Sequence, residues 1–205
     1  EHDKLTWLNE RRRDANGRSA EDPDFDTRTL RVPEDYVRKQ TPAMRQWWAF
    51  KSRNMDTVLF FKVGKFYELF HMDADVGVRE LDCLYMKGDK AHAGFPEIAY
   101  GKFSEQLVAK GYRVARVEQV ETPDQLKERN AKAARGAKEN VVRRELCAVL
   151  TPGTRMHGPM DAVHMAEARG AGSGDGSPPG SSPAGRRSSA GAAAAGSGRG
   201  VGRDA

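Results

Sequence analysis

The chain has 205 residues and a net charge of +5, with 38% hydrophobic and 31% charged residues. That length allows one domain with a hydrophobic core and leaves room for a second small one. A balance this mildly basic permits nucleic-acid binding without requiring it, and no apolar run approaches the length of a membrane span, so no membrane partner is expected.

Composition divides the chain into three segments. Residues 1–39 form a charge-dense leader with recurring Pro, which either lies on the domain or is loose, and Trp7 is a candidate anchor for a short helix in it. Residues 40–156 hold most of the aromatic and branched aliphatic side chains and are predicted to form the folded domain. Residues 157–205 are rich in Gly, Ala, Ser and Pro, so they cannot bury enough apolar surface to fold and are predicted to be a disordered C-terminal tail.

Two further features concern the chain as a whole. It opens on Glu1 rather than Met, which indicates a fragment, and the tail is then either an unstructured extension or a gene-model artefact. Cys83 and Cys147 form no metal-binding or redox spacing, so both are expected to be core thiols in a reducing compartment.

The first half of the domain begins with a helix over residues 41–53, where Thr41 is the expected N-cap and Pro42 the first helical residue. The β-rich run Thr57–Val63 follows and is predicted to be a buried strand that ends at Gly64. Apolar residues at helical spacing then predict a helix from near Leu69. A second strand is predicted over Leu81–Met86, followed by a loop with a short extended piece.

The second half continues the alternation of helices and strands. The segment "GKFSEQLVAKG" reads as a helix closed by Gly111, and Arg113–Glu118 alternates as a strand. Thr122 and Gln125 form a capping-box pattern that opens a charged helix, and Val142–Leu150 is the last predicted strand. This order predicts an α/β fold, a mixed β-sheet flanked by helices. The residues expected in its core are Trp47 or Trp48, Leu59, Leu107, Val114 and Leu146.

The sequence gives little support to enzymatic chemistry. Lys65 and Lys102 follow glycines but lack the rest of a P-loop, so nucleotide hydrolysis on such a loop is excluded. The run "HMDAD" groups His71, Asp73 and Asp75, but on a helix these side chains diverge, so a solvated helix face is favoured over a metal site. Nucleophile–histidine chemistry is neither supported nor ruled out by five His residues.

The segment "VGKFYELF", residues 63–70, allows two interpretations. In extended or turn backbone, Phe66 and Glu68 share a face and project together from an exposed loop. Alternatively, Phe66 packs in the core and Glu68 opens the following helix, where the helix dipole favours a carboxylate. Residue types alone favour the second interpretation.

Several stretches in order resemble the N-terminal mismatch-recognition domain of the MutS family of DNA mismatch repair proteins. They are "TPAMRQWWAFKSRNMDTVLFFKVGKFYELFHMDA", "MKGDKAHAGFPEIAYGKFSEQLVAKGYRVARVEQVETP" and "VVRRELCAVLTPGT". The leader "DPDFDTRTLRVPEDY" and the double Trp look more like the mismatch-sensing subunit of the eukaryotic MutS-alpha heterodimer than like the bacterial homodimer.

The resemblance implies roles for particular residues. Phe66 would wedge beside a mispaired base, and Glu68 would hydrogen-bond to that base. Lys65 and Tyr67 would contact the DNA backbone or support the loop, and Lys87 and His92 are weaker candidates for phosphate contacts. Val63 and Gly64 complete the implied set of supporting contacts.

The resemblance also implies partners and a compartment. The expected ligand is double-stranded DNA with mismatches or small loops, the expected protein partner is a second MutS homologue, and the expected location is the nucleus. The family's ATPase domain, with its ATP and magnesium, is expected to be absent, so the chain is expected to hold no cofactor and not to be an enzyme. The alternative is a folded protein-interaction module, or a truncated gene product without DNA binding of its own.

Overall fold

The computed structural model describes residues 2–134 and 137–154. Their sheet has the strand order β3-β2-β1-β4-β5. Only β1 and β4 run parallel, and every other neighbouring pair is antiparallel. The predicted α/β class with a mixed sheet is therefore confirmed, whereas the tail predicted over 157–205 lies outside the described residues.

The elements follow the chain in alternation. The strands are β1 (Thr57–Val63), β2 (Phe66–Phe70), β3 (His92–Pro96), β4 (Arg113–Gln119) and β5 (Arg144–Leu150). The α-helices are α1 (Glu34–Arg38), α2 (Pro42–Lys51), α3 (Met72–Leu81), α4 (Tyr100–Ala109) and α5 (Pro123–Lys132). Two short 3-10 helices complete the set, η1 (His2–Lys4) and η2 (Glu97–Ala99).

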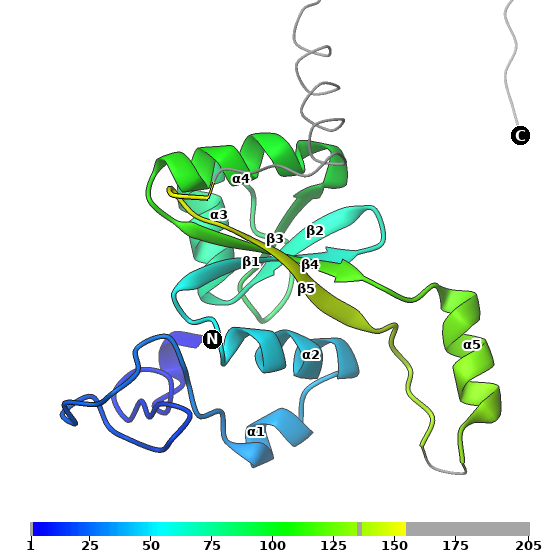
Figure 1. The fold of residues 1–205 in the computed structure, drawn as a ribbon, viewed down its shortest axis with the longest axis horizontal. Coiled ribbons are helices and arrows are strands. Elements are labelled where there is room, and N and C mark those ends of the chain that lie inside the picture. The colour runs from blue at the N-terminus through cyan, green and yellow to red at the C-terminus, as the bar shows by residue number, and fades with distance from the viewer. Residues whose placement is uncertain (1, 135–136, 155–205) are drawn as a thin grey trace, which may run out of the picture. The chain divides into compact units, whose positions relative to one another are not determined.

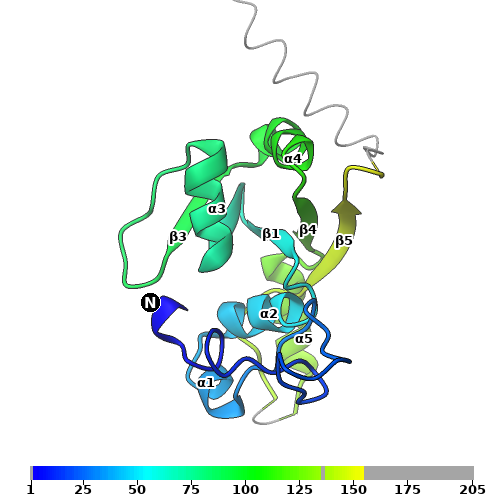
Figure 2. The same ribbon diagram turned by 90° about the vertical axis from the view of Figure 1, so that its left-hand side faces the viewer.

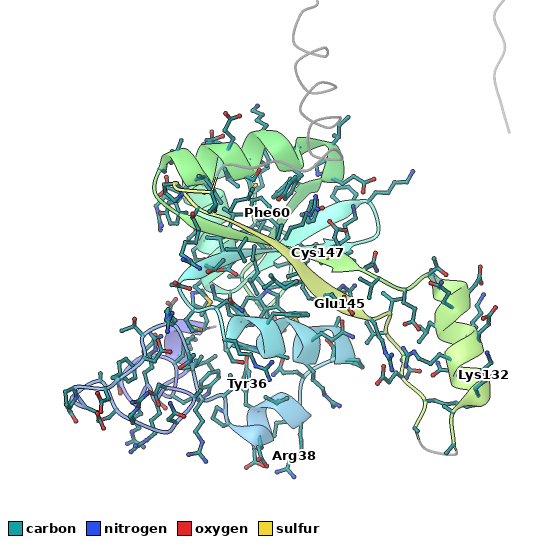
Figure 3. The ribbon with its side chains drawn as sticks, viewed as in Figure 1. Tyr36, Arg38, Phe60, Lys132, Glu145 and Cys147 are labelled. Atoms are coloured by element: carbon teal, nitrogen blue, oxygen red, sulfur yellow. The ribbon has the colours of Figure 1, made fainter. Side chains whose placement is uncertain are left out.

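Helices cover both faces of the sheet (Figures 1 and 2). On one face α3 and α4 pack over a cluster that includes Phe60, Leu69 and Leu107, and Figure 3 shows Phe60 on this side, beneath α4. On the other face lie α2 and the leader, where Leu8 and Leu30 join Trp47 in a second cluster. The leader thus lies on the domain, while its boundary at residue 40 stays a prediction.

Local signals in the sequence account for several of these elements. The Thr41 side chain accepts a hydrogen bond from the Met44 amide and caps α2. The capping box of Thr122 and Gln125 is formed at the start of α5. Gly111 follows α4 with φ of +91°, which a side chain would disfavour, so it ends the helix as predicted.

Two predicted elements are wrong. Residues 66–70 form strand β2, and the helix predicted from near Leu69 begins at Met72. The strand predicted over Leu81–Met86 does not exist, because α3 continues through Leu81 and ends at Asp82 in a left-handed conformation. Its place in the sheet is taken by β3, where Ala93 and Phe95 alternate into the core.

Several burial predictions need correction as well. Cys83 is buried as expected, but Cys147 is exposed. It lies in the outermost strand β5 (Figure 3), where an irregularity in the pairing leaves it without a Cα partner in β4. Leu146 is only half-buried, whereas the other predicted core residues are buried.

The "HMDAD" segment is also not a solvated helix face. His71 and Asp73 are both buried. The Asp73 carboxylate accepts hydrogen bonds from the Lys51 ammonium (2.7 Å) and from the Leu59 amide (3.0 Å), so it ties α3 to α2 and to β1. No group of metal-ligating side chains is found among residues 2–134 and 137–154. In the same part of the chain, no helix is long and apolar enough to cross a membrane.

Candidate nucleic-acid interface

Hydrogen bonds from two other parts of the chain fix the turn between β1 and β2. Val63 pairs with Phe66, so Gly64 and Lys65 alone form the turn. Gly64 has φ of +59°, which tight hairpin turns require and glycine adopts without strain. Its amide donates to the Gln119 Oε1 (3.1 Å), and the Lys65 carbonyl accepts from the Glu97 amide (2.9 Å). The exposed turn therefore has a defined position at the end of the hairpin.

Phe66 and Glu68 share one face of β2, because side chains alternate along a strand. Tyr67 and Leu69 point to the opposite face and lie in the core, where Tyr67 is 2% exposed. Phe66 is 45% exposed. The interpretation in which Phe66 packs in the core and Glu68 opens a helix is therefore wrong, and the two side chains share a face as the extended interpretation requires, although on a strand and not a loop.

Glu68 lies beside groups that can carry positive charge. Its Oε2 is 3.2 Å from the Nε2 of His92, whose ring stacks on Phe70 at 4.6 Å and is oriented by that contact. The Arg144 guanidinium lies 4.6 Å from the ring centre of Phe61, the residue that pairs with Glu68 in β1. Burial lowers the pKa of Arg144, and the Glu68 carboxylate partly opposes that shift. Glu68 is thus a half-buried carboxylate that lies close to two basic side chains.

Tyr67 supports the hairpin from beneath. Its hydroxyl donates to the Glu118 carboxylate on β4, and burial together with that carboxylate raises the pKa of the phenol. The Lys62 ammonium lies 4.8 Å from the centre of the Tyr67 ring and pairs with Glu97. Of the two roles expected for Tyr67, the geometry favours support of the loop over contact with DNA.

The remaining predicted residues lie at different places around Glu68. Val63 is half-buried at the end of β1, and Lys65 is exposed in the turn. His92 opens β3 beside Glu68, whereas Lys87 is exposed in the loop between α3 and β3. The structure therefore brings Phe66, Glu68 and His92 onto neighbouring strands and leaves Lys87 without a contact that joins it to them.

Two neighbours of Glu68 were not predicted. Gly94 pairs with Glu68, and a Cβ atom there would lie 2.9 Å from the Met86 Cε and 3.0 Å from the Tyr67 carbonyl oxygen. The Met86 methyl group therefore covers the backbone directly beside Glu68. An isolated glycine inside a strand signals such a close approach and is the available clue in "AHAGFP". Arg144 gave no comparable signal, because its place depends on the pairing of β5 with β4.

Comparison with known proteins gives consistent matches. A family model for MutS domain I matches residues 41–158. DNA mismatch repair protein Msh6 of Homo sapiens is 53% identical over 162 residues, which cover 78% of this chain and 12% of the human protein. DNA mismatch repair protein MSH6 of Arabidopsis thaliana is 54% identical over 158 residues, covering 77% of this chain and 12% of that protein.

A bacterial relative matches over a shorter stretch. DNA mismatch repair protein MutS of Clostridium perfringens is 39% identical over 122 residues, which cover 57% of this chain and 12% of that protein. The chain spans only about 12% of the length of each of these three relatives.

Proposed function

Because the chain belongs to the MutS family, through the domain I that its residues 41–158 match, we propose that it binds duplex DNA at mispaired bases in DNA mismatch repair. The observation that carries the proposal is that Phe66, which is 45% exposed, lies on the same face of β2 as Glu68. The exposed part of the Phe66 ring remains in water, and a ligand that covers it gains the free energy of burying apolar surface.

Phe66 is proposed to act as an apolar wedge. Insertion of such a side chain between base pairs costs a few kcal/mol of unstacking per step and kinks the duplex. A mispaired or bulged base is already poorly stacked, so the same insertion costs less there. Preference for a mismatch then follows from the deformability of the DNA, without contacts that identify each base.

Glu68 is proposed to accept a hydrogen bond from the displaced base. A carboxylate close to phosphates is electrostatically unfavourable unless it gains such a bond, so Glu68 would also penalise ordinary pairs. The Nε2 atom of His92, on the neighbouring strand, lies 3.2 Å from this carboxylate.

The surrounding residues would position the hairpin on the DNA. Lys65 and Lys87 are exposed and suit salt-sensitive contacts with phosphate oxygens. Gly64 and Val63 shape the turn that presents Phe66, and Tyr67 supports it through Glu118. Because the domain is only mildly basic, we expect weak binding by this chain alone.

The proposal assigns no catalytic step, ATP or magnesium to the described residues. By resemblance to the full-length family, the protein partner would be a second MutS homologue and the location would be the nucleus. The ligand would be duplex DNA with mismatches or small loops.

The test compares the affinity for a G·T heteroduplex with that for the matched G·C duplex, by fluorescence anisotropy at one low salt concentration. We expect tighter binding to the heteroduplex. Equal affinities would favour the alternative, a protein-interaction module or a truncated product without DNA recognition.

A further inference from the structure

A cavity in the leader has no part in the proposed mismatch contact. It measures about 560 Å³ and is lined by Trp7, Arg11, Arg13, Arg31 and the start of α1. The leader packs along α2 and lies apart from the β1–β2 hairpin (Figure 1). A volume of roughly 300–1,000 Å³ is typical of small-molecule sites, so the cavity is large enough for a ligand of ordinary size.

The three arginines of the cavity differ from two others in the leader, Arg18 and Arg28, which pair with acidic side chains. Arg18 pairs with Asp14 and Arg28 pairs with Asp26, so these two serve the fold of the leader. Arg11, Arg13 and Arg31 are exposed and have no acidic partner within residues 2–134 and 137–154.

Within the described residues, the side chains of Arg13 and Arg31 contact the backbone of the leader. Arg13 donates to the Gly17 carbonyl (2.8 Å), and the Arg31 Nη1 lies beside Gly17. Three guanidinium groups against the single carboxylate of Glu34 make the cavity electropositive. Guanidinium groups match the geometry of phosphate oxygens through paired hydrogen bonds, so a phosphate is the anion that this arrangement favours.

Trp7 adds an aromatic surface to the same cavity. Its ring is tilted by 59° against Tyr36 at 4.9 Å and meets Trp48 nearly edge-on at 5.4 Å. Figure 3 shows Tyr36 on the side of α2 that faces away from the sheet. Neither neighbour lies parallel to the indole, and Val32 and Pro33 continue the apolar lining. An indole beside arginines suits stacking of a nucleobase, which contributes binding energy with little dependence on base identity.

We propose that this cavity binds a nucleotide, with its base against Trp7 and its phosphate between Arg13 and Arg31. The ligand is one nucleotide that carries both a base and a 5′-phosphate. Either a free mononucleotide or the 5′ end of a DNA single strand supplies it. The site acts independently of Phe66.

Tryptophan fluorescence of the full chain provides the readout. Trp47 and Trp48 are 0% and 1% exposed, whereas Trp7 is half-buried, so quenching by a ligand in the leader reports on Trp7. Thymidine 5′-monophosphate is expected to quench the fluorescence of Trp7 at concentrations below about 10 mM. Thymidine alone and inorganic phosphate alone are each expected to bind about tenfold more weakly. An oligothymidylate with a 5′-phosphate binds more tightly than the mononucleotide if the source is a single strand, and no more tightly if it is free nucleotide.

Paired substitutions separate binding from damage to the fold. Arg31→Gln is expected to lower the affinity for the mononucleotide about tenfold. Glu34→Gln is expected to raise that affinity severalfold, because it removes the one negative charge that repels the phosphate. Arg53 is an exposed arginine two residues after α2 and outside the cavity, so Arg53→Gln is the matched control and should leave binding unchanged.

Three results would overturn the proposal. They are no quenching by the mononucleotide, equal binding of inorganic phosphate alone, and tighter binding of a glutamate-rich peptide at the same arginines. Phe66→Ala should leave the quenching unchanged, so failure of this proposal is distinguishable from failure of mismatch binding.

Discussion

His71 should make the domain lose stability in mildly acidic solution. Its side chain is 0% exposed, between Trp47 at 5.3 Å and Trp48 at 5.1 Å from ring centre to ring centre. Neither ring nitrogen has a hydrogen-bond partner in the described part of the chain. Burial, with smaller contributions from Lys90 and His2, lowers the pKa of His71 from 6.5 to about 3.

The sign and size of the effect follow from that shift. Because the pKa is lower in the folded state, the unfolded chain binds the proton more readily, and stability is lost as pH falls below 6.5. With a folded pKa of about 3, the loss from this one group between pH 8 and pH 5 is about 2 kcal/mol.

The assay is urea unfolding of the wild type and of His71→Asn across that pH range. Asn stays neutral, so the free energy of unfolding of the variant should depend less on pH. Any change in stability that the smaller side chain causes is the same at every pH. If the two proteins lose stability equally as pH falls, His71 is not the cause of the loss. That result would mean that the folded state accommodates a charged imidazole at this site.

Two further substitutions test contacts between distant elements. Asp73→Asn leaves the buried Lys51 ammonium without a counter-charge and should cost about 3–5 kcal/mol in urea unfolding, with part of the loss recovered by adding Lys51→Met. Gly94→Ala places a Cβ 3.0 Å from the Tyr67 carbonyl and should lower stability by roughly 1–3 kcal/mol in thermal unfolding, a loss that Met86→Ala would relieve only in part because the backbone contact remains.

Sequence patterns predicted the elements whose signals are local. Thr41, with Pro42 after it, marks the start of α2, and the β-branched and aromatic run of Thr57–Val63 has no competing pattern. The segment "FYELF" was missed because its five-residue alternation overlaps apolar residues at helical spacing. Pairing with β1 and β3 decides that competition, and no local pattern carries this information.

The candidate site was predictable in part for the same reason. Resemblance to the family identified Phe66 and Glu68, and the strand places them on one face. The burial of Asp73 was not predictable, because its partner Lys51 lies on another helix and the two meet only when α2 and α3 pack on opposite faces of β1. Short runs of charged residues read as solvated unless a tertiary partner is known.

Phe66→Ala, measured for both stability and mismatch preference, shows whether Phe66 is the wedge. Because the Phe66 side chain is 45% exposed, the substitution should change the free energy of unfolding by no more than about 1 kcal/mol. Leu84→Ala, an 84% exposed apolar residue in the loop after α3, is the matched control. We expect Phe66→Ala to abolish the preference for a G·T heteroduplex while salt-sensitive binding to matched duplex survives. Leu84→Ala should keep the preference. If the Phe66→Ala protein keeps the preference, or loses roughly 3–5 kcal/mol of stability as truncation of a core residue would, Phe66 is not the wedge.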